Sequence, residues 1–213
     1  MTRTTPTCVL LLLAVAAASS AEILDRIAVT VGKQVISESA ILLDLRVSAF
    51  LDSKPVDLSP SAKRRAAGRL VDQILILQEA ADSHVTLQVD QDVEKMLGQV
   101  KTQYGGDYQA ALARYGLTEK DVTAQLAMGL RTLEFTDLRF RPEVQISEQD
   151  LRTYYDKFAA NLREKKADVP PFESSRDQIQ ELLTDQRLTE ALDRWLAMTR
   201  NQTDIVYRPQ VVP

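Results

Sequence analysis

The chain has 213 residues, with 26 lysines and arginines against 30 aspartates and glutamates, one histidine and one cysteine. This composition excludes a disulfide-stabilised scaffold, and a net charge of −4 excludes a polybasic nucleic-acid binder. An apolar fraction of 45% is enough to bury an extended core, and only seven glycines among many helix-forming residues predict a mostly α fold.

The first residues have the layout of a secretory signal. Arg3 lies in a short polar start, an uncharged apolar run follows, and residues 19–21 are the small residues that a signal peptidase requires. The alternative is an uncleaved membrane anchor, but the run is too short for the ~20 residues of a spanning helix. Cys8 precedes the apolar run, whereas a lipid-modified cysteine follows it. Cleavage after Ala21 is therefore expected, with residues 1–21 as a signal peptide.

A β-hairpin is predicted directly after the signal. Residues 27–31 alternate apolar side chains with small or polar ones. Gly32 and Lys33 are placed for a two-residue turn that returns the chain through Val35 and Ile36.

Two helices should follow the hairpin. Ser37 is placed to cap the first, which Pro55 stops. Ser59 is placed to cap the second, with Pro60 in its first turn. Apolar residues wrap most of the second helix, which predicts that it is the central buried helix. They are Leu70, Val71, Ile74, Leu75, Ile76 and Leu77.

Shorter helices are expected in the middle of the chain. Asp90 is placed to cap one that runs into residues 104–106, and a brief helix lies between Asp107 and Gly116. A capping box at Thr118 then begins a helix that Pro142 ends. That helix has one apolar stripe, formed by Val122, Leu126, Leu130 and Leu133.

The C-terminal part begins with a capping box at Ser147, which opens another helix. Residues 163–171 are polar, then basic and proline-bearing, which is typical of a linker. Residues 204–209 (DIVYRP) are short, β-prone and ended by Pro209, which predicts an edge strand that pairs with the hairpin. This pairing would require the last helix to fold back onto the first ones. The stripe of this last helix comprises Ile179, Leu182, Leu183, Leu188, Leu192, Trp195 and Leu196.

Few residues suit catalysis or metal binding. His84 follows the central helix, and no GxSxG nucleophile motif accompanies it, so a helix-end role is expected. Without a mature cysteine and with one histidine, thiol catalysis and the usual zinc sites are excluded. Glu148, Asp150 and Asp156 fall at helix starts or on polar faces, and no glycine-rich phosphate loop is present. We predict no catalytic residue, no cofactor and no metal.

Apolar and aromatic surface is expected around the Gly105-Gly106 joint, where short helices build only a thin core. Flexible methionine and amphipathic tyrosine suit a surface that binds many different apolar ligands. Packing of the short helices against one another is the alternative role. The predicted ligand-binding residues are Met96, Tyr104, Tyr108, Tyr115 and Met128.

Five strings cover nearly all of the mature chain in a characteristic order. They are LDRIAVTVGKQVIS (24–37), LVDQILILQEA (70–80), GLTEKDVTAQLAMGLRTLEF (116–135), VQISEQDLRTYYDKF (144–158) and FESSRDQIQELLTDQRLTEALDRWLAMTRNQTDIVYRP (172–209). In this order they resemble the SurA family of periplasmic chaperones and its relatives with parvulin peptidyl-prolyl isomerase modules.

The resemblance implies a helical chaperone domain in residues 22–162, closed by a helix and strand in residues 172–213. In the family the isomerase modules lie between these two parts, where this chain has only the nine residues 163–171. Nine residues cannot hold a parvulin fold. We therefore expect no isomerase module and no enzymatic activity.

The same resemblance implies a periplasmic, ATP-independent holdase. It would bind unfolded outer-membrane proteins or aromatic-rich peptides in an apolar cleft, with no nucleic acid as partner and no stable membrane insertion after signal cleavage. Two alternatives stay open: a peptidyl-prolyl isomerase that acts through an undetected site, and a structural subunit of an envelope complex. An isomerisation assay and co-purification of a stoichiometric partner distinguish them.

Overall fold

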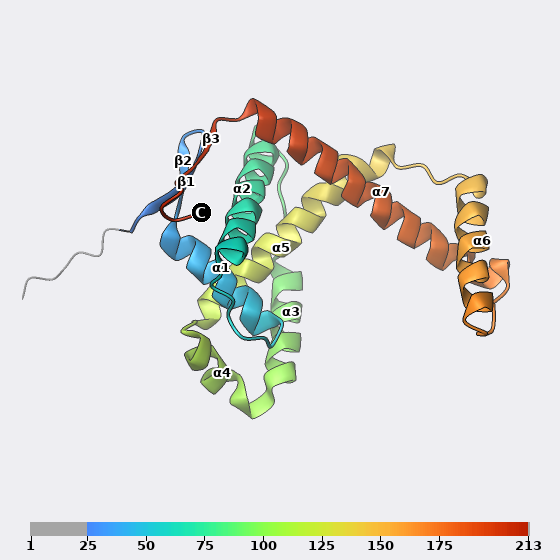
Figure 1. Ribbon diagram of the computed structural model, residues 1–213, viewed down its shortest axis with the longest axis horizontal. Coiled ribbons are helices and arrows are strands. Elements are labelled where there is room, and N and C mark those ends of the chain that lie inside the picture. Colours follow the sequence, from blue (N-terminus) through green and yellow to red (C-terminus); the bar gives the residue numbers. More distant parts are fainter. Residues whose placement is uncertain (1–24, 213) are drawn as a thin grey trace, which may run out of the picture.

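The computed structural model describes residues 25–212 and is mostly helical (Figure 1). Within these residues it has seven α-helices, two 3-10 helices and one three-stranded antiparallel sheet, so the predicted fold class is confirmed. The predicted signal peptide, with Cys8, lies outside the described residues. The elements are β1 Ile27–Val31, β2 Gln34–Ser37, α1 Glu38–Leu51, α2 Pro60–Asp82, α3 Asp90–Tyr104, η1 Gly105–Asp107, α4 Tyr108–Tyr115, α5 Glu119–Phe140, η2 Arg141–Glu143, α6 Glu148–Glu164, α7 Phe172–Gln202 and β3 Ile205–Tyr207.

The small sheet joins the two ends of the described chain. Its strand order is β2-β1-β3 and both pairs are antiparallel, so the predicted hairpin and the predicted pairing of the tail strand are confirmed. Gly32 has a φ of 55°, which glycine adopts without a steric penalty and which permits the tight turn between β1 and β2. Because β3 follows α7, this pairing brings the last helix back to the start of the chain.

The central buried helix is α2, as predicted. It contacts α1, α5, α7 and the first two strands. Ala66 and Val71 on this helix are fully buried in one cluster with the sheet and α1. The Ser59 hydroxyl accepts a hydrogen bond from the Ala62 amide at 3.3 Å, which confirms the predicted start of the helix.

A buried carboxylate joins three of the helices. Asp44 of α1 has a side chain that is 1% exposed, and it forms an ion pair with Arg69 of α2. Its second oxygen accepts a hydrogen bond from Gln125 Nε2 of α5 at 3.2 Å. A charge removed from water requires such partners, so these contacts specify how α1, α2 and α5 pack.

Local capping signals locate most helix ends correctly. Thr118 and Ser147 form capping boxes with residues three positions later, and Gly116 ends α4 with a φ of 62°. One start was predicted wrongly: Asp90 is the first residue of α3, and Val89 occupies the cap position without a side-chain hydrogen bond. The charge of Asp90 in the first turn still favours the helix N-terminus.

The last helix, α7, is 31 residues long, and therefore about 46 Å. Its C-terminal half crosses α2 and α5, whereas its N-terminal half extends beyond them and has α6 packed on it (Figure 1). Arg200 holds the C-terminal half to α2 through Asp72 at 2.7 Å and the Gly68 carbonyl at 3.0 Å. Burial raises the pKa of Asp72 above its usual range although Arg200 opposes that shift.

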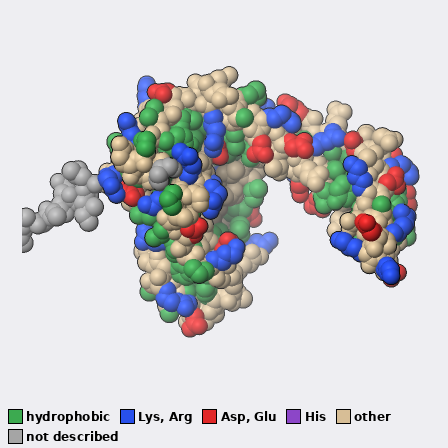
Figure 2. Space-filling view, in the orientation of Figure 1, with side chains coloured by type: hydrophobic (Ala, Val, Ile, Leu, Met, Phe, Trp, Pro, Cys, Tyr) green, Lys and Arg blue, Asp and Glu red, His purple; other side chains and the backbone are tan. Residues whose placement is uncertain are grey.

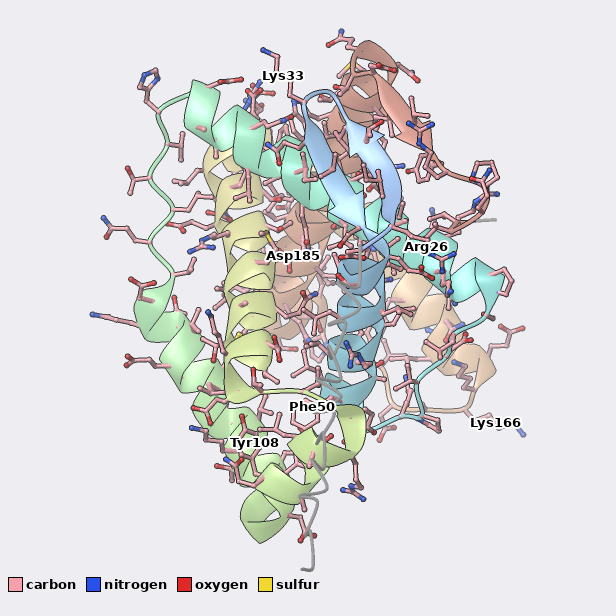
Figure 3. All side chains as sticks on the ribbon, turned by 90° about the vertical axis from the view of Figure 1, so that its left-hand side faces the viewer. Arg26, Lys33, Phe50, Tyr108, Lys166 and Asp185 are labelled. Carbon is pink, nitrogen blue, oxygen red and sulfur yellow. The ribbon has the colours of Figure 1, made fainter. Side chains whose placement is uncertain are left out.

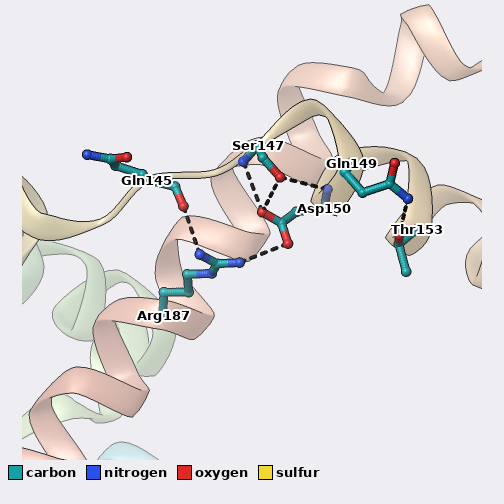
Figure 4. Close-up of polar contacts among 6 residues, drawn as sticks. All are labelled: Gln145, Ser147, Gln149, Asp150, Thr153 and Arg187. Atoms are coloured by element: carbon teal, nitrogen blue, oxygen red, sulfur yellow. Dashed lines mark hydrogen bonds and ion pairs between the residues drawn. The ribbon is translucent and has the colours of Figure 1, made fainter.

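Polar contacts hold α6 against the extended half of α7 (Figure 4). Arg187 of α7 donates to the Gln145 carbonyl at 2.8 Å and pairs with Asp150 of α6 at 2.9 Å. Arg176, nearer the N-terminus of α7, pairs with Glu148 of α6 at 3.0 Å. Two helices that project from the rest of the molecule thus keep a defined arrangement.

The connection between α6 and α7 is short. Residues 163 and 164 still belong to α6, so the predicted linker begins inside that helix and its remaining residues, 165–171, form the turn. The Tyr155 hydroxyl donates to the Pro170 carbonyl at 2.8 Å, and the Tyr155 ring packs against Phe172 with centroids 5.3 Å apart. None of the helices in residues 25–212 combines the length and apolar character needed to cross a bilayer.

The two capping boxes predict an acid-sensitive stability. The Thr118 hydroxyl and amide hold the pKa of Asp121 below its ordinary value, and the Ser147 hydroxyl and amide, with Arg187, do the same for Asp150. The unfolded state therefore binds more protons, so this stability is present above about pH 4 and is lost as pH falls through the folded pKa values. Urea unfolding measured between neutral and acidic pH tests this with the double variant Asp121→Asn, Asp150→Asn. Its free energy of unfolding should fall less steeply with decreasing pH than that of the parent chain.

The matched control for that experiment is Asp156→Asn, since Asp156 is an exposed carboxylate of α6 outside both capping boxes. It should leave the slope of stability against pH unchanged. An acid decline equally steep in the double variant and the parent chain would contradict the assignment. The raised pKa of Asp72 changes the free energy of unfolding with pH in the opposite direction. This contribution cancels in the comparison, because the parent chain and both variants retain Asp72.

Candidate functional site

Three of the predicted binding residues surround one buried ring. Phe50 at the end of α1 is fully buried, and Tyr104 stacks on it with centroids 4.6 Å apart and an interplanar angle of 9°. Tyr108 and Tyr115 meet the same ring edge-on at 6.1 and 5.7 Å. The cluster lies where α1 meets α3 and α4 (Figure 3), so these rings fill the interior between the short helices.

Hydrogen bonds occupy two of the three tyrosine hydroxyls. Tyr104 donates to the Phe50 carbonyl, and Tyr115 donates to the Lys54 carbonyl at 2.9 Å. The Tyr108 hydroxyl is shielded from solvent, and its burial, with the nearby Glu119 carboxylate, raises its pKa. These contacts are those of packing residues, which favours the alternative role for the three tyrosines.

The two predicted methionines lie apart from this cluster. Met96 on α3 is 37% exposed, and Met128 on α5 is half-buried. Neither belongs to the apolar cluster that contains the tyrosines. The structure thus brings three of the five predicted residues together, and ligand binding by any of the five stays a prediction.

A different concave surface lies between α5 and α7, beneath the projecting helix (Figure 2). Its volume is about 620 Å³. We call it the α5–α7 groove. Residues from the loop before α3, from α3, α5 and η2, and from α7 line it: Gln88, Val89, Asp92, Leu130, Leu133, Glu134, Thr136, Asp137, Arg141, Asp185, Leu188 and Thr189.

The floor of the groove arises where α5 changes its buried face. Near its start α5 buries Val122 and Leu126, but near its end it buries Phe135 and Phe140 against α7. Leu133, two residues before Phe135, points away from that contact and is 67% exposed. Leu133 belongs to the apolar stripe predicted for its helix, but this end of the stripe is exposed, and the side chain lines the groove.

The other wall belongs to α7. Leu188 is buried against α5, while Asp185 and Thr189, one helical turn apart, face the hollow. A second, open depression of about 760 Å³ shares these two residues and is lined by α7 alone, including Glu181 and Leu182, which is 37% exposed. The surface of the groove therefore continues onto the open face of α7.

Carboxylates dominate the charge of this surface. Asp137 forms an ion pair with Arg141, the one cationic residue of the lining. Glu134 Oε2 is shielded from solvent and accepts no hydrogen bond from any residue in 25–212. The carboxylates of the two hollows are Asp92, Glu134, Asp137, Glu181, Asp185 and Glu190. These carboxylates, which we call the acidic rim, lie beside the apolar residues of the lining, and Glu134 is a partly buried one among them.

This arrangement suits binding rather than covalent chemistry. The lining contains leucines, threonines, amides, carboxylates and one guanidinium. His84 lies outside it at the end of α2, exposed, with a φ of 55° and its ring Nδ1 3.1 Å from the Asp82 carbonyl, which confirms the expected helix-end position. Among residues 25–212 no group of three or more potential metal ligands converges.

Sequence reasoning missed the exposed leucines of the groove. Leu133 and Leu182 fall on apolar stripes that predict a buried position, and no local signal distinguishes them from their buried neighbours.

Comparison with known proteins adds a distant similarity to folding factors. No protein-family profile matches the chain. The chain is 33% identical over 73 residues to foldase protein PrsA 2 of Listeria monocytogenes serotype 4b (strain F2365), which covers 34% of this chain and 24% of that protein. It is 36% identical over 66 residues to the foldase protein PrsA 2 of Listeria innocua serovar 6a, covering 31% and 21%.

The matched segment spans about a quarter of these relatives' length. Both relatives are named as foldases, which supports the broader part of the resemblance seen in the sequence, the one to protein-folding factors. About a third of this chain is thus distantly related in sequence to foldases.

Proposed function

We propose that the protein is an ATP-independent chaperone that holds unfolded polypeptide segments in the α5–α7 groove. One observation carries the proposal: Leu133 is 67% exposed and lines a concave surface, in a chain of which about a third is distantly similar to foldases. Exposed apolar surface of this kind costs solubility and marks an interaction site when it lies in a hollow with a polar rim. The distant similarity to foldases supports unfolded chains as the ligand.

The client class and the compartment are part of this proposal. We propose unfolded outer-membrane proteins as clients and the periplasm as location, on the basis of the SurA-like order of motifs and the predicted signal peptide. A holdase lowers the concentration of free unfolded chains by mass action, which slows their aggregation. Several weak contacts along the groove would permit release when the client folds elsewhere.

An aggregation assay tests the proposal directly. The protein is titrated into an unfolded outer-membrane β-barrel diluted out of urea, and light scattering is followed against an inert control protein. We expect dose-dependent suppression. Leu133→Ser should raise the concentration for half-suppression about tenfold, because an apolar contact of one leucine side chain contributes roughly 1.5 kcal/mol.

The matched control is Leu138→Ser, which removes a leucine that is 53% exposed on the same helix but outside the groove. Both leucines are exposed, so neither substitution should change the free energy of unfolding by more than about 0.5 kcal/mol. Equal loss of suppression in both variants would show that the groove is not the binding site. Unchanged scattering with the folded parent chain would refute client binding altogether.

We further propose that binding proceeds without catalysis. The interval where the SurA family has isomerase modules is the nine residues 163–171 in this chain. A proline-peptide isomerisation assay on the parent chain should show only the uncatalysed rate. Catalysis above that rate would establish the alternative function.

A further inference from the structure

We infer that the α5–α7 groove selects client segments in which apolar residues are flanked by lysine or arginine. This inference rests on the proposed function and names its substrate class. It follows from the charge of the groove: six carboxylates and one guanidinium line its two hollows, and that guanidinium, of Arg141, is already paired with Asp137.

Several of the rim carboxylates form no ion pair within the described part of the chain. Glu134, Glu181 and Asp185 have no cationic group within ion-pair distance there, although ion pairs are common elsewhere on its surface. Asp137, the ion-pair partner of Arg141, raises the pKa of that guanidinium most, and the charges of Asp185 and Glu181 help to raise it. Glu134 Oε2 is in addition shielded from solvent without a hydrogen bond, which raises the free energy of that group until a donor approaches. An arriving ammonium or guanidinium group would supply the donor.

Carboxylates lie next to leucines on both walls. On α5, Leu133 is adjacent to Glu134, and on α7, Leu182 lies between Glu181 and Asp185. A segment lying in the groove would therefore place apolar side chains against these leucines and meet negative charge beside them. Like charge on the segment would be repelled, so the rim excludes acidic segments as well as attracting basic ones.

The test uses three dye-labelled synthetic peptides with the same leucine and phenylalanine positions. The intervening positions carry lysine in the first peptide, glutamine in the second and glutamate in the third, and binding is measured by fluorescence anisotropy. We expect the lysine peptide to bind about tenfold more tightly than the glutamine peptide and the glutamate peptide to bind weakest. The preference should disappear near 1 M salt, where the screening length is about 3 Å.

Two triple variants distinguish the effect of the rim carboxylates from the effect of the net charge of the protein. Glu134→Gln with Glu181→Gln and Asp185→Asn neutralises the rim and should weaken the lysine peptide about tenfold while leaving the glutamine peptide unchanged. The control makes the same change in net charge away from the groove, with Glu94→Gln, Asp107→Asn and Asp168→Asn, all exposed residues. The control should bind the lysine peptide as the parent does.

Four other outcomes would contradict specific parts of these proposals. Equal binding of the three peptides, weakened by Leu133→Ser, would refute charge selection and leave the proposed function intact. Absence of binding by all three would refute both. Equal loss in the two triple variants would show a general charge effect, and concentration-dependent self-association abolished by the rim variant would show that a second copy of the chain occupies the groove.

Discussion

Phe50→Ala is expected to lower the free energy of unfolding by about 3–5 kcal/mol. The Phe50 ring is fully buried and contacts three tyrosine rings from α3 and α4. Alanine would remove the surface on which these rings pack and leave a cavity that the short helices α3 and α4 can close only by moving.

Urea unfolding followed by circular dichroism measures this effect, and amide hydrogen exchange locates it. We expect the greatest loss of protection in α3 and α4, because they have few other buried side chains. Phe158→Ala is the control, since Phe158 on α6 is 37% exposed and should cost less than about 1 kcal/mol. A comparable loss in both variants would show that Phe50 does not organise this part of the molecule.

Phe135→Ala is expected to cost about 3–5 kcal/mol and to loosen α7 from α5. Phe135 is 2% exposed and lies 5.4 Å from the Trp195 ring and 6.1 Å from the Phe140 ring, measured between centroids. This aromatic cluster is where α7 packs on α5 before it projects. Its loss should therefore alter the groove as well as the stability.

Trp195 is the single tryptophan of the chain, so intrinsic fluorescence reports on this contact. The native emission of Phe135→Ala should shift to longer wavelength as the indole gains solvent, and the urea midpoint should fall. Leu138→Ala, at a 53% exposed position of the same helix, should change neither. An unshifted emission in a destabilised Phe135→Ala protein would show that α7 stays docked without this ring.

Capping and turn signals were sufficient to predict the elements because they act within a few residues. The side chains of Ser37, Ser59, Thr118 and Ser147 accept hydrogen bonds from the amides of the following turn, and Gly32 and Gly116 occupy the left-handed backbone that ends an element. The mostly α fold, the central position of α2 and the return of the tail strand to the hairpin follow from these signals and from apolar periodicity.

The candidate site did not follow, because burial depends on partners that are distant in the sequence. The tyrosines near Gly105 and Gly106 have the composition of a binding surface. They are packed in the interior only because Phe50 lies where their rings can contact it. Leu133 and Leu182 have the periodicity of core residues. Only the docking of α7 at Phe135 and the projection of its other half leave these two side chains exposed.

The sequence by itself thus determined the helices, most of their ends, the small sheet and the scarcity of catalytic side chains, since each depends on short-range chemistry or composition. The tertiary structure alone decided which apolar residues became core and which became groove. The physical reason is that a helix offers more apolar surface than its neighbours cover, and the crossing of α5 and α7 selects the part that stays open.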